Sequence, residues 1–190
     1  AVCVMGAALA GLSFYGAASW AGTTRALMAR LEAAGTAGAC PSAFATHFDL
    51  RELDGLPAPV QRYFRTVLTP GQPMVTAVSI ALSGRFNLSP TREQWKPFTS
   101  QQRILTHRPG FLWDARVLVL PGVVVRVVDS YIAGEGRLRA ALLGLFTVAQ
   151  AQGQGSDELA RGEFMRWFAE APWYPTALLP SQGVRWQAVD

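Results

Sequence analysis

Two carboxylates, Asp114 and Asp129, lie in stretches of alternating apolar and polar residues that are typical of β-strands. A carboxylate buried beside apolar neighbours has a raised pKa, which suits general acid or base catalysis. The same side chains could instead form salt bridges with Arg116 or Arg126, and we favour that structural role. Asp114 and Asp129 are therefore candidates for a catalytic carboxylate pair, with an ion-paired structural role as the preferred alternative.

Metal and cofactor chemistry find little support in the residue types. The two histidines, His47 and His107, are far apart in the sequence, and the cysteines Cys3 and Cys40 do not have metal-ligand spacing. No glycine-rich phosphate loop, nucleophile elbow or zinc-binding helix occurs. We expect no metal and no cofactor.

The net charge of +4 is modest, and its strongest basic excess lies between residues 85 and 126. Nucleic-acid binding would need these arginines on one face with stacking aromatic residues. A solvated sheet face near anionic lipid headgroups explains the excess more simply. We expect no nucleic-acid partner, and the sequence does not indicate an oligomeric state.

The first charged residue of the chain is Arg25, so residues 1–24 form an uncharged run of the length that crosses a bilayer as a helix. We predict a single-pass transmembrane anchor whose helix continues through residues 25–32. Two alternatives remain: a secretory signal cleaved after Ala17-Ala18-Ser19, and a buried helix of a soluble domain. The anchor predicts a location in a bacterial inner membrane or cell envelope.

After the anchor (1–32), residues 33–43 have the composition of a flexible linker, and residues 44–190 form a β-rich globular domain. Two amphipathic helices are predicted in this domain, one from Pro57 to Leu68 and one from Ser156 to Ala171. In the second helix, Glu163 and Glu170 stand at spacings that allow surface ion pairs with Arg166.

Between the helices, the residue pattern changes to a period of two. We predict strands from Met74 to Leu88, 98–106, 111–120 and 123–132, and a further strand over 137–148, where a helix is the alternative. A final strand is predicted at 184–187, and because it has no following partner we expect the domain to be incomplete. The fold class is α+β, a curved antiparallel meander packed with two or three amphipathic helices behind an N-terminal transmembrane helix.

Both faces of the predicted sheet carry apolar residues between Leu112 and Val128. In a sheet with one solvent-exposed face, apolar and polar residues alternate more regularly along each strand. We therefore expect that helices cover the second face or that this face lines an apolar cavity. Coverage is the simpler explanation. If the cavity exists, its candidate ligand-binding residues are Leu112, Trp113, Leu118, Tyr131 and Trp167.

Several short motifs together resemble an uncharacterised family of bacterial membrane-anchored proteins, a domain-of-unknown-function group. They are Leu56-Pro57-Ala58-Pro59-Val60-Gln61-Arg62-Tyr63-Phe64, Trp95-Lys96-Pro97-Phe98, Phe111-Leu112-Trp113-Asp114-Ala115, Asp129-Ser130-Tyr131 and Arg166-Trp167-Phe168-Ala169-Glu170. The resemblance implies a short N-terminal membrane segment and further strands beyond Asp190. It implies no activity and no catalytic residues. The half-barrel of periplasmic lipoprotein carriers is an expected fold relative.

Three functional hypotheses follow. The domain could bind a lipid or another apolar small molecule at the membrane, act as a membrane-tethered hydrolase with a carboxylate pair, or serve as a structural envelope module. Ligand binding is favoured over an enzymatic role.

Overall fold

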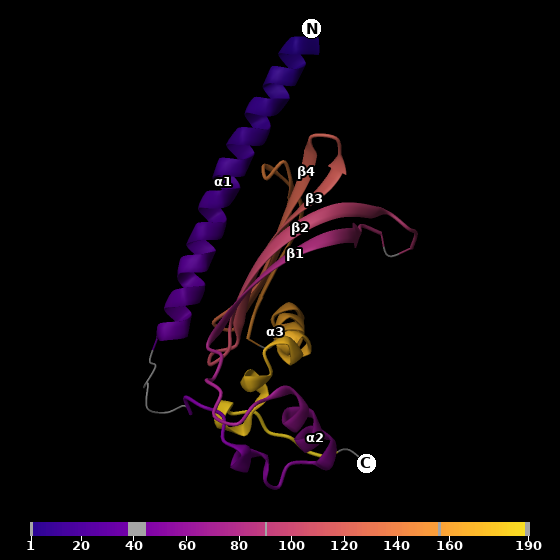
Figure 1. Ribbon diagram of the computed structural model, residues 1–190. Helices are drawn as coiled ribbons and strands as arrows, with labels where there is room; N and C mark the ends of the chain where they lie inside the picture. Colours follow the sequence, from indigo (N-terminus) through magenta and orange to yellow (C-terminus); the bar gives the residue numbers. More distant parts are fainter. Residues whose placement is uncertain (1, 38–44, 90, 156, 189–190) are drawn as a thin grey trace.

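The computed structural model describes residues 2–37, 45–89, 91–155 and 157–188 (Figure 1). Six strands form one antiparallel sheet in which each strand pairs with its sequence neighbours, and this confirms the predicted α+β meander. The main elements are α1 (Val2–Thr36), η2 (Leu50–Leu53), α2 (Ala58–Val67), β1 (Ala77–Asn87), β2 (Trp95–Leu105), β3 (Gly110–Leu120), β4 (Val123–Ile132), β5 (Glu135–Leu142), β6 (Phe146–Gln154) and α3 (Glu158–Glu170). Three short 3₁₀ helices follow α3: η3 (Ala171–Trp173), η4 (Pro175–Leu178) and η5 (Pro180–Gln182).

Two predicted strands are wrong. The stretch 137–148 contains most of β5, a turn and the start of β6 rather than one strand. At the turn, Leu143 and Gly144 both adopt a positive φ, which permits a tight hairpin. The predicted strand at 184–187 is irregular, and Trp186 instead packs edge-on against Phe64 of α2.

Helix α1 covers one face of the sheet, which we call the α1 face and which includes Leu112, Asp114 and Val128. Trp20 is buried there, and its indole Nε1 donates a hydrogen bond to Asp114 Oδ1 at 2.9 Å. At 1.5 Å per residue, the 35 residues of α1 extend for about 52 Å. Figure 1 shows that the N-terminal part of the helix projects past the end of the sheet.

The predicted coverage of the second face is therefore confirmed where α1 lies. Leu112 and Val128 are buried beneath it, whereas Leu118 is 41% and Leu120 62% exposed. Two ion pairs also hold the same helix against the sheet. Arg30 of α1 pairs with Glu135 of β5 at 2.9 Å, and Glu32 of α1 pairs with Arg103 of β2 at 2.8 Å.

Helix α1 ends at Thr36, so it includes the first residues of the predicted linker. Residues 38–43 of that linker, which include Cys40, lie outside the described residues. Nowhere in the described part of the chain does a helix combine the length and apolarity that a bilayer crossing requires.

The opposite face, which we call the α3 face, holds Phe111, Trp113 and Asp129. Helix α3 packs on it, and Figure 1 shows α3 and α1 on opposite sides of the sheet. Below α3, a compact group of short helices that includes α2 completes the core. Its buried residues include Phe48, Leu53, Phe64, Tyr174 and Leu179.

The close approach of α1 to the β5–β6 turn depends on Gly16. A Cβ at this position would lie 2.0 Å from the carbonyl oxygen of Leu143, whereas a Cβ at Gly22 would meet nothing within 4 Å.

We predict that Gly22→Ala stabilises the protein by up to about 1 kcal/mol through helix propensity. Gly16→Ala is predicted to be destabilising, because the helix must move away from the turn. Urea unfolding of the two variants, followed by tryptophan fluorescence, measures the difference, and equal stabilisation by both would contradict this packing.

Candidate functional site

A group of charged residues lies between α3 and the α3 face of the sheet. Arg166 forms ion pairs with Asp129 on β4 and with Glu170 one helical turn further along α3, the second at 2.9 Å. Its guanidinium also lies over the rings of Phe111 and Trp113, 4.7 and 5.4 Å from their centroids. These contacts attach α3 to β3 and β4 through one arginine.

Glu170 has a second partner on the sheet. Gln102 on β2 donates from Nε2 to Glu170 Oε2 at 2.6 Å, and its side chain is buried. The arginine and the glutamine therefore hold both oxygens of this carboxylate. The predicted pair of Arg166 with Glu170 is confirmed, but it is part of the helix–sheet interface rather than a surface pair.

Glu163 and Asp129 form a carboxyl pair beside Arg166. Burial, together with the nearby charge of Asp129, raises the pKa of Glu163 to about 7. Burial also raises the pKa of Asp129, although the charge of Arg166 opposes this change. Among the described residues, Asp129 Oδ1 and Glu163 Oε2 are buried without a hydrogen-bond partner. A proton shared between the two carboxyls satisfies both atoms.

The structure places the two predicted catalytic candidates on opposite faces of the sheet. Trp113 is paired with Asp129, and Asp114 with Val128, so the two aspartates project to opposite sides. Asp114 accepts the hydrogen bond from Trp20 under α1, and burial raises its pKa. The expected ion pair of Asp129 with Arg116 or Arg126 is wrong, because its partner is Arg166. Asp114 and Asp129 do not form a pair.

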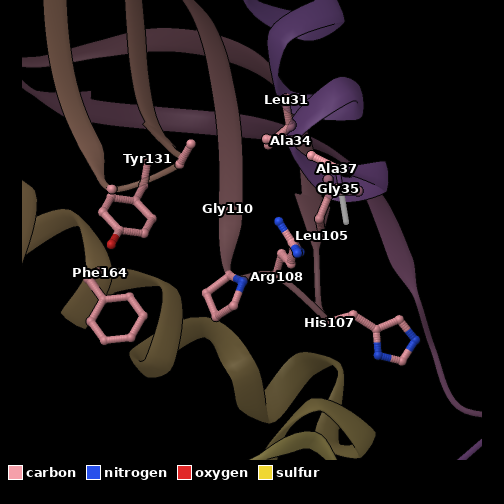
Figure 2. A pocket seen from close by; sticks show the side chains of 13 residues that line it. Leu31, Ala34, Gly35, Ala37, Leu105, His107, Arg108, Gly110, Tyr131 and Phe164 are labelled. Carbon is pink, nitrogen blue, oxygen red and sulfur yellow. The ribbon is translucent and has the colours of Figure 1, made fainter. Parts of the chain in front are cut away.

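An apolar pocket of about 400 Å³ lies where the end of α1 meets the sheet and α3 (Figure 2). We call it the α1–α3 pocket. The rings of Tyr131 and Phe164, with centroids 5.4 Å apart, form one wall. Leu31 and Ala34 of α1 contribute to the wall across from them, as Figure 2 shows.

The polar groups of this pocket come mainly from the β2–β3 turn, which contributes His107 and Arg108. In Figure 2, Arg108 lies between the aromatic wall and the α1 wall. Its side chain is exposed and forms no ion pair with any described residue. The pocket thus combines apolar walls with one available cation.

A second pocket of about 430 Å³ shares Pro109 and Phe164 with the first and lies on the side of η5. Its lining includes Trp167, whose indole Nε1 donates to the Leu105 carbonyl at 3.0 Å. Phe164 therefore separates two adjoining hollows beside α3.

The five predicted ligand-binding residues do not lie together. Tyr131 lines the α1–α3 pocket and Trp167 the neighbouring one. Trp113 lies beneath Arg166, and Leu112 is buried under α1. Leu118 lies towards the uncovered end of the sheet. The pocket residues that these predictions missed are Leu31, Ala34, Arg108 and Phe164.

Two sequence signals could have identified part of this site. Phe164 belongs to the apolar stripe of α3, and Arg108 precedes the Pro-Gly pair of a predicted turn. The contribution of α1 has no such signal, because it depends on the helix folding back along the sheet. Within the described residues, no group of three or more His, Cys, Asp or Glu side chains could hold a metal ion.

The carboxyl pair makes stability depend on pH. Because the pKa of Glu163 is about 7 in the folded protein and 4.5 in an ordinary glutamate, folding favours its protonated form. The associated stability is present below about pH 4.5 and is lost as the pH rises to about 7. We predict that Glu163→Gln removes this loss and makes the protein more stable than wild type at pH 8 by about 1 kcal/mol, a value reduced for solvent screening.

Urea unfolding between pH 5 and pH 8 measures this effect. Glu158→Gln is the matched control, because Glu158 is exposed on the same helix. The control should keep the wild-type pH dependence. A wild-type slope that persists in Glu163→Gln would show that Glu163 does not hold the shared proton.

Comparison with known proteins gives one match. No curated protein and no solved structure matches the chain, so the expected likeness to lipoprotein-carrier half-barrels has no support. Residues 54–190, more than two thirds of the chain, match the model of a family of unknown function (DUF6920). This range includes the whole sheet, α2 and α3, so the chain belongs to the DUF6920 family.

Proposed function

We propose that this protein binds a lipid-like ligand, with an apolar chain and an anionic group, in the α1–α3 pocket beside a membrane. The observation that carries the proposal is the pocket itself, whose volume of about 400 Å³ lies within the range of about 300–1,000 Å³ typical of small-molecule sites. Such sites combine largely apolar walls with a few polar groups that orient the ligand.

The chemistry of the lining supports this ligand class. The adjacent Tyr131 and Phe164 rings and the α1 side chains offer an apolar surface for a hydrocarbon chain. Arg108, without an ion-pair partner among the described residues, can bind a carboxylate or a phosphate.

The N-terminal uncharged run supports a membrane location within the same proposal. Residues 1–24 carry no charge, and Phe14 and Tyr15 are largely exposed on α1. A single-pass anchor in the inner membrane or envelope would place the α1–α3 pocket on a domain tethered to the bilayer, where lipids are abundant.

The carboxyl pair gives less support to a hydrolase. Asp129 and Glu163 line neither the α1–α3 pocket nor the neighbouring one. Asp129 on β4 contacts both Arg166 and Glu163 of α3, and these contacts join α3 to the sheet. We therefore assign the pair a structural role and retain binding as the proposed function.

Filling the pocket tests the proposal. Ala34 lines it, so Ala34→Trp should occupy the space between α1 and Phe164. We predict at least a ten-fold loss of binding of a dansylated fatty acid to the full chain in detergent micelles. The same variant should lose lipid that co-purifies with the wild-type protein, as measured by native mass spectrometry.

Ala33→Trp is the control, since Ala33 is exposed on the same helix turn and does not line the pocket. It should bind the fatty acid as the wild type does. Equal binding by wild type, Ala34→Trp and Ala33→Trp would refute a ligand site in this pocket.

A further inference from the structure

The β3–β4 hairpin has an uncharged apolar tip bounded by two arginines. Between Arg116 and Arg126, residues 117–125 read Val-Leu-Val-Leu-Pro-Gly-Val-Val-Val. Both faces of this tip are apolar, and Leu118 and Leu120 are 41% and 62% exposed. A hairpin tip in water normally carries polar residues, so this composition calls for an apolar partner.

The β5–β6 hairpin has the same character. No charged residue occurs from residue 140 to residue 155, and Arg139 precedes this stretch. Phe146 and Val148 are 58% and 61% exposed near the turn. Each hairpin thus has an uncharged tip that begins after an arginine.

Helix α1 brings a third uncharged segment to the same end of the sheet. Gly16 packs against the β5–β6 turn, so the preceding residues project beyond that turn. Phe14 and Tyr15 in this part are exposed. Figure 1 shows the projecting helix and the β3–β4 hairpin at one end of the molecule. We call the projecting helix and the two hairpin tips together the apolar end.

Two arginines lie behind the apolar end. Arg116 and Arg126 are directly opposite each other on β3 and β4, where two like charges repel. Arg126 is buried, and the charge of Asp114 acts on both arginines. Arg116 is exposed and forms no ion pair with a described residue. A phosphate bound to Arg116 would offset the repulsion, and guanidinium groups bind phosphate well.

The spacing of these features fits the layers of a membrane. Leu120 lies four strand residues from Arg116, about 13 Å at 3.3 Å per residue. The headgroup layer of one leaflet is roughly 5–8 Å thick, from a total of about 40–45 Å and a hydrocarbon core of about 30 Å. The tip can therefore reach hydrocarbon while Arg116 remains at the level of the phosphates.

We propose that the apolar end docks on a phospholipid bilayer, with the β3–β4 and β5–β6 tips inserted and the exposed Arg116 bound to a lipid phosphate. A bilayer is the occupant because it offers hydrocarbon and phosphate in this order over the whole end. The inference requires neither the α1–α3 pocket nor a helix that crosses the membrane.

Depth-dependent fluorescence quenching tests the docking. Cys3 and Cys40 are first replaced by serine in the full chain, and a bimane label is attached to Leu120→Cys or, as a matched control, Leu50→Cys. Leu50 is also exposed but lies in η2, below the sheet. The protein is reconstituted with vesicles of phosphatidylcholine and phosphatidylglycerol (7:3) that contain doxyl-labelled lipid. The label at position 120 should be quenched at least three-fold more than the label at position 50, and equal quenching would overturn the proposal.

The exposed arginine is tested in the same assay. Arg116→Gln should reduce quenching at position 120 at least two-fold. Arg62→Gln removes one exposed charge of α2 and should have no effect. Circular dichroism verifies that each variant is folded. Unchanged quenching in Arg116→Gln would refute phosphate binding by this residue.

The pocket variant separates this inference from ligand binding. Ala34→Trp should leave the quenching at position 120 unchanged, because the α1–α3 pocket lies near the other end of the sheet-bound part of α1. Docking that fails while fatty acid still binds would overturn only the membrane inference, and the reverse result would overturn only the proposed function.

Discussion

A sheet with two apolar faces requires a cover on each side, and most of the architecture follows from how the two covers are attached. On the α1 face, the indole of Trp20 reaches the buried Asp114, and Gly16 allows the helix to approach the β5–β6 turn. On the α3 face, Arg166 joins the helix to β3 and β4 through a carboxylate and two aromatic rings. Each cover therefore combines apolar burial with polar contacts that fix its position.

The two covers also create the candidate binding site. The α1–α3 pocket exists because both helices extend to the end of the sheet where the β2–β3 and β4–β5 turns lie. Leu31 of α1 and Phe164 of α3 reach it from different directions, and neither helix alone would enclose it. Ligand binding at this position would thus depend on both helices remaining against the sheet.

Regular alternation made much of the sheet predictable, whereas tertiary contacts did not. Strand β4 agrees with its predicted bounds because Val123–Ile132, rich in β-branched residues, lies between two clear turns. The β5–β6 hairpin was missed because its turn begins with Leu143, a residue that rarely adopts a positive φ. In the site, Tyr131 and Trp167 were found as large residues near apolar strands. The place of Arg108 in the pocket and the pairing of Asp129 with Arg166 were not predicted. Both depend on segments that are distant in the sequence.

The fit of α1 to the sheet has a consequence for changes in chain length. Contacts at Gly16, Trp20, Leu27, Leu31 and Gly35 all lie on one side of the helix. One inserted residue among them would rotate everything on one side of the insertion by about 100° and turn half of these contacts away from the sheet. An insertion before Gly16 would leave them in place. The helix therefore has one segment of fixed length and one whose length can vary, and the boundary between them is the glycine at the β5–β6 turn.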